Sequence, residues 1–185
     1  EGQNTIYAWT NDTANNINET NITFTIDSVP PSITINTPVN NTAYNTNEIT
    51  FNITLNEEGT CNYSIDFGEN NISMETTDNQ TFNHTNTSMP DGNYNVIFYC
   101  IDTIGNTRSK SAIFKTDTII PEITFEPNTE ISGTTINRNH IIINVTGIDN
   151  TLNYTLINIY NSTAELVNVT TSTNNNTFVN YTAPS

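Results

Sequence analysis

The chain has 185 residues and a formal net charge of −15, with four Lys and Arg against nineteen Asp and Glu. Nucleic-acid binding needs clustered positive side chains that neutralise phosphates, so this composition excludes it and disfavours an anionic membrane surface. No apolar run reaches the ~18 residues of a membrane-spanning helix. An acidic surface suits solubility, salt or a bound cation instead.

Two residue types dominate the composition, with 35 Asn and 35 Thr, and Ile follows with 25. Leu, Ile, Val and Phe together make up 44 of the 185 residues. That share lies above the ~20% below which a highly charged chain is disordered, so disorder remains only an alternative. β-branched side chains favour strands over helices. Because no segment shows a sustained 3.6-residue period, we predict an all-β protein with almost no helix.

Residues 1–30 show the pattern of two strands joined by a turn. Ile22, Phe24 and Ile26 are separated by threonines, so the apolar residues share one face of a strand. Asp27 and Pro31 follow at the spacing expected of a junction between consecutive domains. We therefore predict that residues 1–30 hold the last two strands of a domain.

Residues 31–119 have the features of a complete domain. Ile49, Phe51, Ile53 and Leu55 alternate with polar residues, as in a half-buried strand. Turn-forming stretches at 57–59, 90–92 and 104–106 separate the predicted strands. Many short strands separated by such turns are typical of a β-sandwich or a β-barrel.

Residues 120–185 repeat the earlier pattern but stop before its last two strands. The segment 111–125 resembles 21–35, and 140–155 resembles 48–64, with offsets of 90 to 92 residues. This period is the size of one immunoglobulin-like domain. We therefore predict tandem immunoglobulin-like β-sandwich domains of about 90 residues each.

Three motifs carry a resemblance to a known family. They are the D-x-x-x-P junctions at 27–31 and 117–121, the T-C-N-Y-S strand at 60–64, and the G-N-Y…F-Y-C-I-D…G-N hairpin at 92–106. With these motifs the whole chain resembles the immunoglobulin-like repeat regions of large archaeal and bacterial cell-surface and filament glycoproteins. The resemblance implies an extracellular location and says little about function.

The domain pattern is circularly shifted along the chain. The C-terminal residues 177–185 followed by residues 1–12 align with residues 81–102, so each end holds what the other lacks. Residues 1–30 of one copy would then complete the domain formed by residues 120–185 of an adjoining copy. Copies could be joined in one tandem polypeptide or could be separate subunits that exchange strands head to tail. Neither end resembles a natural terminus, which favours the tandem array.

The two cysteines, Cys61 and Cys100, lie 39 residues apart in the complete domain. In the repeat alignment their counterparts are Leu152 and Trp9, so both positions change together to apolar residues. Paired core positions behave this way, and a secreted context permits a disulfide. We predict a Cys61–Cys100 disulfide and a core contact between Trp9 of one copy and Leu152 of another. Two buried free thiols are the alternative.

N-glycosylation sequons are unusually frequent. Random order of these residues gives 35 × 46/185, or about nine, because 46 residues are Ser or Thr. The sequence holds sixteen, which favours selected glycosylation in a secreted protein over low-complexity drift. The predicted sites are Asn11, Asn18, Asn21, Asn40, Asn52, Asn62, Asn71, Asn79, Asn83, Asn86, Asn144, Asn153, Asn161, Asn168, Asn175 and Asn180.

Calcium is the small ligand that the acidic residues favour most. Asp27 and Asp117 lie at the two predicted domain junctions, and Asp102 precedes a tight turn. Carboxylate oxygens there could hold Ca²⁺ and stiffen an array. The alternative is that each aspartate caps a turn through its own backbone. The sequence predicts no other cofactor.

No catalytic motif is present, and we expect no enzymatic activity. The sequence favours a structural component of an extracellular filament or surface array. Two alternatives are the spacer stalk of an adhesin and a carbohydrate-binding module. The last needs an exposed aromatic platform, for which the candidates are Tyr7, Tyr44, Tyr94, Tyr99, Tyr160 and Tyr181.

Overall fold

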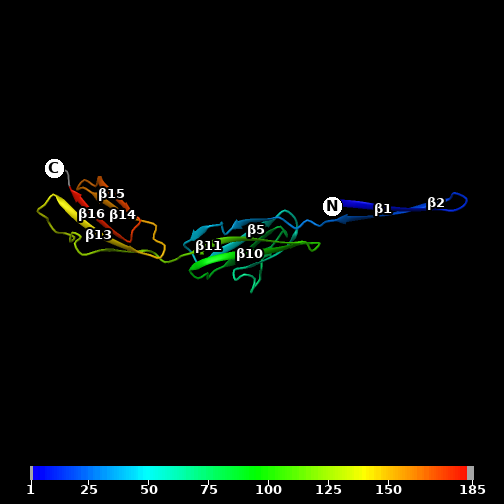
Figure 1. Cartoon of the computed structure of the whole chain (residues 1–185), viewed down its shortest axis with the longest axis horizontal. Coiled ribbons are helices and arrows are strands. Elements are labelled where there is room, and N and C mark those ends of the chain that lie inside the picture. The colour runs from blue at the N-terminus through cyan, green and yellow to red at the C-terminus, as the bar shows by residue number, and fades with distance from the viewer. Residues whose placement is uncertain (1, 183–185) are drawn as a thin grey trace. The chain divides into compact units, whose positions relative to one another are not determined.

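A computed structural model describes residues 2–182, which contain strands and no helix. No helix among these residues could therefore cross a membrane. The strands (Figure 1) are β1 (Gly2–Asn11), β2 (Ile17–Ile26), β3 (Ile33–Thr37), β4 (Thr42–Tyr44), β5 (Ile49–Leu55), β6 (Gly59–Ser64), β7 (Ile72–Ser73), β8 (Glu75–Thr76), β9 (Thr81–Asn86), β10 (Gly92–Asp102), β11 (Thr107–Thr116), β12 (Glu122–Phe125), β13 (His140–Ile148), β14 (Thr155–Tyr160), β15 (Leu166–Ser172) and β16 (Asn176–Thr182).

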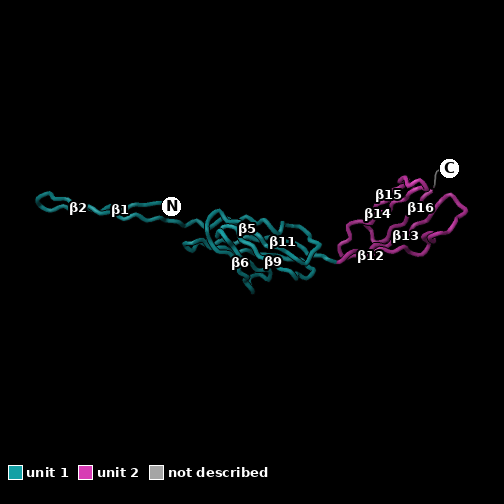
Figure 2. Tube along the Cα trace, turned by 180° about the vertical axis from the view of Figure 1, so that it is seen from behind, with its two compact units in different colours: residues 1–118 teal, residues 119–185 magenta. Residues whose placement is uncertain are grey.

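The chain divides into two compact units, residues 1–118 and residues 119–185 (Figure 2). Unit 1 contains the β1–β2 hairpin followed by a β-sandwich, and unit 2 contains the remaining strands. The hairpin ends at Ile26 and the first sandwich strand begins at Ile33.

The sandwich of unit 1 packs a five-stranded sheet on a four-stranded sheet. The first has the order β4-β11-β10-β6-β7 and the second has the order β3-β5-β9-β8. The strand β5 shows why the sequence folds this way, because its four apolar residues are buried while Thr50 is exposed and Asn52 and Thr54 are only partly covered. The alternation predicted for residues 49–55 is therefore present in the structure.

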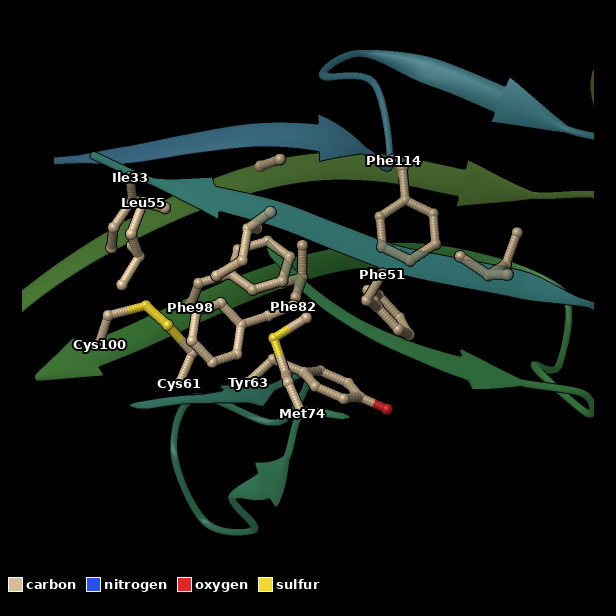
Figure 3. Packing of buried hydrophobic residues seen from close by; sticks show 14 of the residues in the cluster. Ile33, Phe51, Leu55, Cys61, Tyr63, Met74, Phe82, Phe98, Cys100 and Phe114 are labelled. Atoms are coloured by element: carbon tan, nitrogen blue, oxygen red, sulfur yellow. A yellow bond between two sulfur atoms is a disulfide. The ribbon is translucent and has the colours of Figure 1, made fainter. Parts of the chain in front are cut away.

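Fifteen buried residues form the core of unit 1 (Figure 3). Phe51 lies at its centre, stacked on Tyr63 with ring centroids 4.3 Å apart. Phe98 and Phe114 contact the Phe51 ring edge to face at 6.4 and 6.1 Å. Such a cluster of large aromatic side chains supplies most of the apolar burial that holds the two sheets together.

Unit 2 has the same plan with fewer strands. Its sheets are β12-β13-β16 and β14-β15, and its buried apolar core is small, comprising Val145, Ile157 and Val179. The pairing of β12 with β13 repeats that of β3 with β5 in the same register. Gly147 therefore holds the position of Leu55.

Candidate assembly surfaces and carboxylate cluster

The β1–β2 hairpin is exposed on both faces, since every described residue of its two strands is exposed. The register places Ile6 opposite Ile22, and Phe24 and Ile26 lie on the same face. Single exposed apolar residues are ordinary, but a contiguous apolar face on an isolated hairpin marks an interaction surface. Two-stranded hairpins are also marginally stable alone.

The hairpin repeats the β10–β11 hairpin of unit 1 residue by residue. In β1–β2, Asp12 Oδ1 accepts the backbone N–H of Asn16 at 2.9 Å, and Asn16 Nδ2 donates to Asp12 Oδ2 at 2.7 Å. In β10–β11, Asp102 and Asn106 form the same two bonds at 2.9 and 2.8 Å. The strand registers also match, which fixes an offset of 90 residues.

This offset corrects one prediction. The alignment that placed Trp9 at the position of Cys100 is out of register by one residue, because the matched turns put Thr10 there and put Trp9 at the position of Tyr99. A one-residue slip moves a side chain to the other face of a strand. Trp9 therefore lies on the face opposite to Ile6 and is 72% exposed. Leu152 is half-buried, with methyl groups close to the backbone of Gly147.

Among the residues that the structure describes, unit 2 has no counterpart of β10 and β11. Its inner face is correspondingly uncovered. Ile33 of β3 is only 4% exposed, whereas its counterpart Ile123 is 65% exposed and the neighbouring Phe125 is 75% exposed. A groove of about 1080 Å³ runs along this side of unit 2, lined in part by Phe125, Ile141 and Ile143. Unit 2 is therefore a sandwich open on one side.

Three carboxylates converge where the hairpin segment meets the sandwich of unit 1. Asp27 follows β2, Glu57 lies between β5 and β6, and Asp102 ends β10, and one oxygen of each lies within 4.8 Å of the other two. Oxygen ligands of this kind suit a hard cation such as Ca²⁺. Asp117 is not among them, because it follows Thr116, which pairs with Gly92 at the opposite end of β10 from Asp102. Its carboxylate pairs with Lys115 Nζ at 3.1 Å. The calcium hypothesis for Asp27, Asp102 and Asp117 stays a prediction; the structure groups Asp27 and Asp102 with Glu57.

The same aspartates also cap turns. Asp102 Oδ1 accepts backbone N–H groups of Ile104, Gly105 and Asn106 at 2.7–2.9 Å. Burial of the Asp102 carboxyl opposes its charged form, but the hydrogen bonds from Asn106, Ile104 and Gly105 outweigh burial and lower its pKa. Asp27 Oδ1 accepts the N–H of Val29 at 3.1 Å.

Glu57 was not predicted as a candidate ligand because it lies in an acidic turn that suggested simple solvation. The available signal was its recurrence, since Asp149 occupies the same position after β13, 92 residues later. Asp12 likewise corresponds to Asp102, and Asp117 corresponds to Asp27, so all three acidic positions recur at offsets of 90 to 92.

Cys61 and Cys100 form a disulfide that links β6 to β10. Both residues are nearly fully buried, at 4% and 3% exposed. The bond joins directly opposite residues of adjacent antiparallel strands and lies within the apolar core (Figure 3). The structure thus has the cysteine pairing that the repeat pattern predicted.

None of the sixteen sequon asparagines is buried, and all lie within the described residues. Twelve are exposed, and Asn52, Asn86, Asn144 and Asn168 are partly buried. Asn52 faces away from the core, but its side chain accepts from Asn36 Nδ2 at 2.7 Å and donates to the carbonyl of Phe82. A glycan there would take one of the two hydrogens of Asn52 Nδ2 and leave the other for the bond to Phe82.

The tyrosines do not form a common platform. Tyr44 and Tyr94 pack against the core of unit 1, and Tyr181 packs against the core of unit 2. The exposed ones, Tyr7 and Tyr99, lie on different strands of unit 1. Tyr160, also exposed, belongs to unit 2. The structure therefore gives no support to an aromatic carbohydrate-binding surface.

The architecture defines an all-β protein of immunoglobulin-like or fibronectin-like β-sandwich modules. No protein-family model matches the chain. It is 29% identical over 97 residues to halomucin from Haloquadratum walsbyi, an alignment that covers 52% of this chain and 1% of that protein. The chain thus corresponds to a very small part of that relative's length.

Solved structures with a similar fold are distant in sequence. Fibronectin(III)-like modules of Clostridium thermocellum CbhA superpose with a TM-score of 0.48 and 16% identity, covering 83% of this chain and 80% of that one. A tetra-tandem repeat from the extending region of a large adhesion protein gives a TM-score of 0.39 and 17% identity, covering 98% and 48%.

Proposed function

We propose that this chain is a structural component of an extracellular, N-glycosylated surface array or filament, in which copies follow one another in one tandem polypeptide. The observation that carries the proposal is the pair of unsatisfied surfaces. A hairpin with an apolar face and a sandwich open on one side occur in the same chain. Surfaces of this kind are stable only when covered, so the module belongs in an assembly.

Three features support the extracellular location. A disulfide persists in oxidising compartments and is rare in the cytosol. Sixteen accessible or partly accessible sequons suit a sugar-coated surface. The likeness to halomucin, whose name denotes a mucin, agrees with both.

A structural role also agrees with the chemistry of the surface. The chain carries four basic residues against nineteen acidic ones. Such a charge keeps a sugar-coated array soluble and prevents unspecific association of its outer faces.

The test is made on native envelope material. It is boiled in detergent with reductant and divided: one portion is stripped of glycans to measure the polypeptide mass, and the other is digested intact to measure its glycopeptides. We expect sugar on most of the sixteen sequons and a mass many times the 20.6 kDa of this chain. A deglycosylated band near 20.6 kDa would instead favour separate subunits that exchange strands. Unmodified peptides confined to the cytosolic fraction would contradict an extracellular function.

A further inference from the structure

Strand β14 of unit 2 is the counterpart of β6 in unit 1, and its pairing with β15 fixes the register between them. In unit 1, Asn62 of β6 lies opposite Ser73 of β7. In unit 2, Asn158 of β14 lies opposite Val169 of β15. Both members of the second pair follow those of the first by 96 positions. The strands β6 and β14 also have six residues each and begin 96 positions apart.

The contact at the start of each strand agrees with this offset. A Cβ on Gly59 would lie 3.2 Å from Cδ1 of Leu55, and a Cβ on Gly147 would lie 2.8 Å from Oγ1 of Thr155. Since Gly147 holds the position of Leu55, Thr155 holds the position of Gly59. The first and third residues of both strands are buried and the second and fourth are exposed, so the same face of each strand points to the core.

The other edge of β14 is free. In unit 1, β6 pairs with β7 on one side and with β10 on the other. In unit 2, β15 takes the place of β7, and within residues 2–182 no strand takes the place of β10. The free edge therefore offers unpaired backbone donors and acceptors to an added strand.

The strand that fits this edge is the counterpart of β10, which is β1 at an offset of 90 residues. We propose that β1 of a second copy adds antiparallel to the free edge of β14, and that its β2 covers the open groove of unit 2. Thr10 then lies opposite Ile157, at the two positions that the disulfide joins in unit 1, and Ala8 lies opposite Ile159. This inference rests on the proposed assembly of copies and names the contact that joins them.

A second copy is the occupant because the hairpin of the same chain is attached at the opposite end of unit 1. Asn106 Nδ2 donates to the carbonyl of Asp27 at 3.3 Å, so the hairpin joins the sandwich at the turn between β10 and β11. Unit 2 follows Thr116, which pairs with Gly92 at the other end of these strands. The eleven residues of β10 separate the two ends by roughly 35 Å. The hairpin would have to fold back over this whole length to reach unit 2 of its own chain.

The core residues on the two sides of the joint change together. In unit 1, Phe51, Tyr63 and Phe98 contact one another with ring centroids between 4.3 and 6.4 Å apart. The residues at the same positions are all smaller and aliphatic, and they are Ile143, Ile159 and Ala8. The first two belong to unit 2 and the third belongs to the hairpin. A core that shrinks on both sides of the joint keeps its packing density.

The second strand of the hairpin fits the groove in the same way. In unit 1, Phe114 of β11 packs against Phe51 with ring centroids 6.1 Å apart (Figure 3). Their counterparts are Phe24, which is exposed, and Ile143, which lines the groove. Docking would cover both, together with the 75%-exposed Phe125.

The segment between β12 and β13 supports the same occupant. In unit 1 the equivalent segment holds β4, which pairs only with β11. In unit 2 this segment has no strand among its described residues, and Ile131 and Ile136 line the groove. It lacks a strand partner because the counterpart of β11 is β2 of another copy.

The outer face of the joint holds an aromatic pair. The register sets Tyr7 opposite Tyr160, and both rings are exposed in the single chain. Aromatic cross-strand pairs stabilise antiparallel strands. The predicted core contact between Trp9 and Leu152 has no place in this register, because Trp9 lies opposite Asn158 on the outer face.

Transplanting the disulfide of unit 1 to the joint tests the register. Thr10→Cys and Ile157→Cys chains are mixed under mild oxidation, with Cys61 and Cys100 kept in their buried disulfide. We expect a reductant-sensitive dimer at twice the 20.6 kDa chain mass. The matched control mixes Thr10→Cys with Asn158→Cys and should give no such band. Asn158 is exposed whereas Ile157 is buried, so random collisions would favour the control.

A second pair of variants covers the case in which Ile157→Cys weakens the small core of unit 2. Ala8→Cys and Ile159→Cys lie two residues further along each strand, and Ile159 is only partly buried. This pair should cross-link as the first does. Equal dimer from the Asn158→Cys control, or none from either matched pair, would overturn the proposal.

Two further measurements identify the occupant. Sedimentation of the natural chain should show association that Phe24→Ser abolishes without unfolding unit 1, and a chain that stays monomeric at every concentration would overturn the proposal. A single chain that carries both Thr10→Cys and Ile157→Cys should form a ladder of covalent multimers. A bond confined to monomers would also overturn it, because the hairpin would then dock within its own copy. None of these results bears on glycosylation or location, so the proposed function fails only on the envelope measurement.

Discussion

Tyr63 carries a buried hydroxyl in the middle of an aromatic core. The residue is fully buried, and within residues 2–182 its hydroxyl has no hydrogen-bond partner. Burial raises its pKa to about 12 because the phenolate is disfavoured away from water. Such an unsatisfied group destabilises the folded state, whereas the ring itself stabilises it by stacking on Phe51.

We therefore expect Tyr63→Phe to raise the free energy of unfolding of unit 1 by about 1 kcal/mol. Tyr94→Phe is the matched control, because the Tyr94 hydroxyl donates to the carbonyl of Pro90 at 2.8 Å. The free energy of unfolding of unit 1 should fall by about 1 kcal/mol in that variant, because the hydrogen bond is lost. Urea unfolding followed by fluorescence measures both, and equal losses in the two variants would show that the Tyr63 hydroxyl is satisfied.

Two surface aspartates make the stability of unit 1 depend on pH in the acidic range. Asp78 accepts hydrogen bonds from the backbone N–H groups of Thr81 and Gln80, which lower its pKa to about 2. Asp66 accepts hydrogen bonds from the backbone N–H of Asn70 and from the side chains of Ser64 and Asn70, which also lower its pKa to about 2. Because the pKa of each aspartate is lower in the folded state than its ordinary 3.8, its charged carboxylate stabilises the folded state, and this stabilisation is complete above pH 3.8. It is lost as the pH falls through about 2.

The expected result is a melting temperature of unit 1 that falls as the pH is lowered from about 4 to about 2. Asp78→Asn keeps the side-chain shape but removes its titration, so its melting temperature should vary less over this range. Calorimetry at several pH values checks this, and parallel curves for the variant and the natural chain would refute it.

The carboxylate cluster should destabilise unit 1 through charge repulsion when no cation is bound. Asp27, Glu57 and Asp102 place three like charges within 4.8 Å, and their repulsion opposes folding. In a metal-chelating buffer at low salt, Glu57→Gln should raise the melting temperature of unit 1. The calcium hypothesis adds that Ca²⁺ stabilises the natural chain more than the variant. Thermal melts with and without Ca²⁺ separate these effects, and Glu58→Gln, at the neighbouring exposed residue, serves as the control.

At the scale of elements, the disulfide joins two strands that already pair. Cys61 and Cys100 are opposite residues of β6 and β10, separated by 39 positions in the sequence. The cross-link reduces the number of conformations open to the unfolded chain. In the chain-entropy model this adds about 2–4 kcal/mol to the free energy of unfolding. The double variant Cys61→Ala with Cys100→Ala should lose at least that much, since it also leaves small cavities.

Unfolding in denaturant measures this loss, with reduced natural protein as the comparison. Reduction should lower the stability of the natural unit 1 and leave the double variant unchanged. A double variant as stable as the oxidised protein would show that the strands hold each other without the bond. Unit 2 has no cysteine and should not respond.

Element identity was predictable because the alternation of apolar and polar residues decides the strands locally. The strand at residues 49–55 follows from its period-two pattern, and the hairpin motif at 92–106 and the disulfide follow from the repeat. The position of Trp9 was wrong because residue type alone matched it to Cys100. The spacing between Asp12 and Asp102 fixes the true register. Glu57 was missed because its neighbours Asp27 and Asp102 approach it only after distant loops meet.

At the scale of the whole molecule, the two units differ in what covers them. Unit 1 buries fifteen apolar core residues, whereas unit 2 buries three and leaves its open side uncovered. Buried apolar area is the main source of stability, so unit 2 should melt at a lower temperature than unit 1 in dilute solution. Docking of a second copy's hairpin adds the missing area only when copies meet.

The melting temperature of unit 2 should therefore rise with chain concentration, while that of unit 1 stays constant, because binding to the folded state stabilises it by mass action. Salt should strengthen the effect. Two chains of net charge −15 repel each other, and docking would bring Asp12 towards Asp149 as Asp102 approaches Glu57 in unit 1. Calorimetry over a range of concentrations at low and high salt measures both trends. Phe24→Ser should remove the concentration dependence and leave the lower transition where the dilute natural chain has it. Two transitions that never move would mean that unit 2 is complete without a second copy.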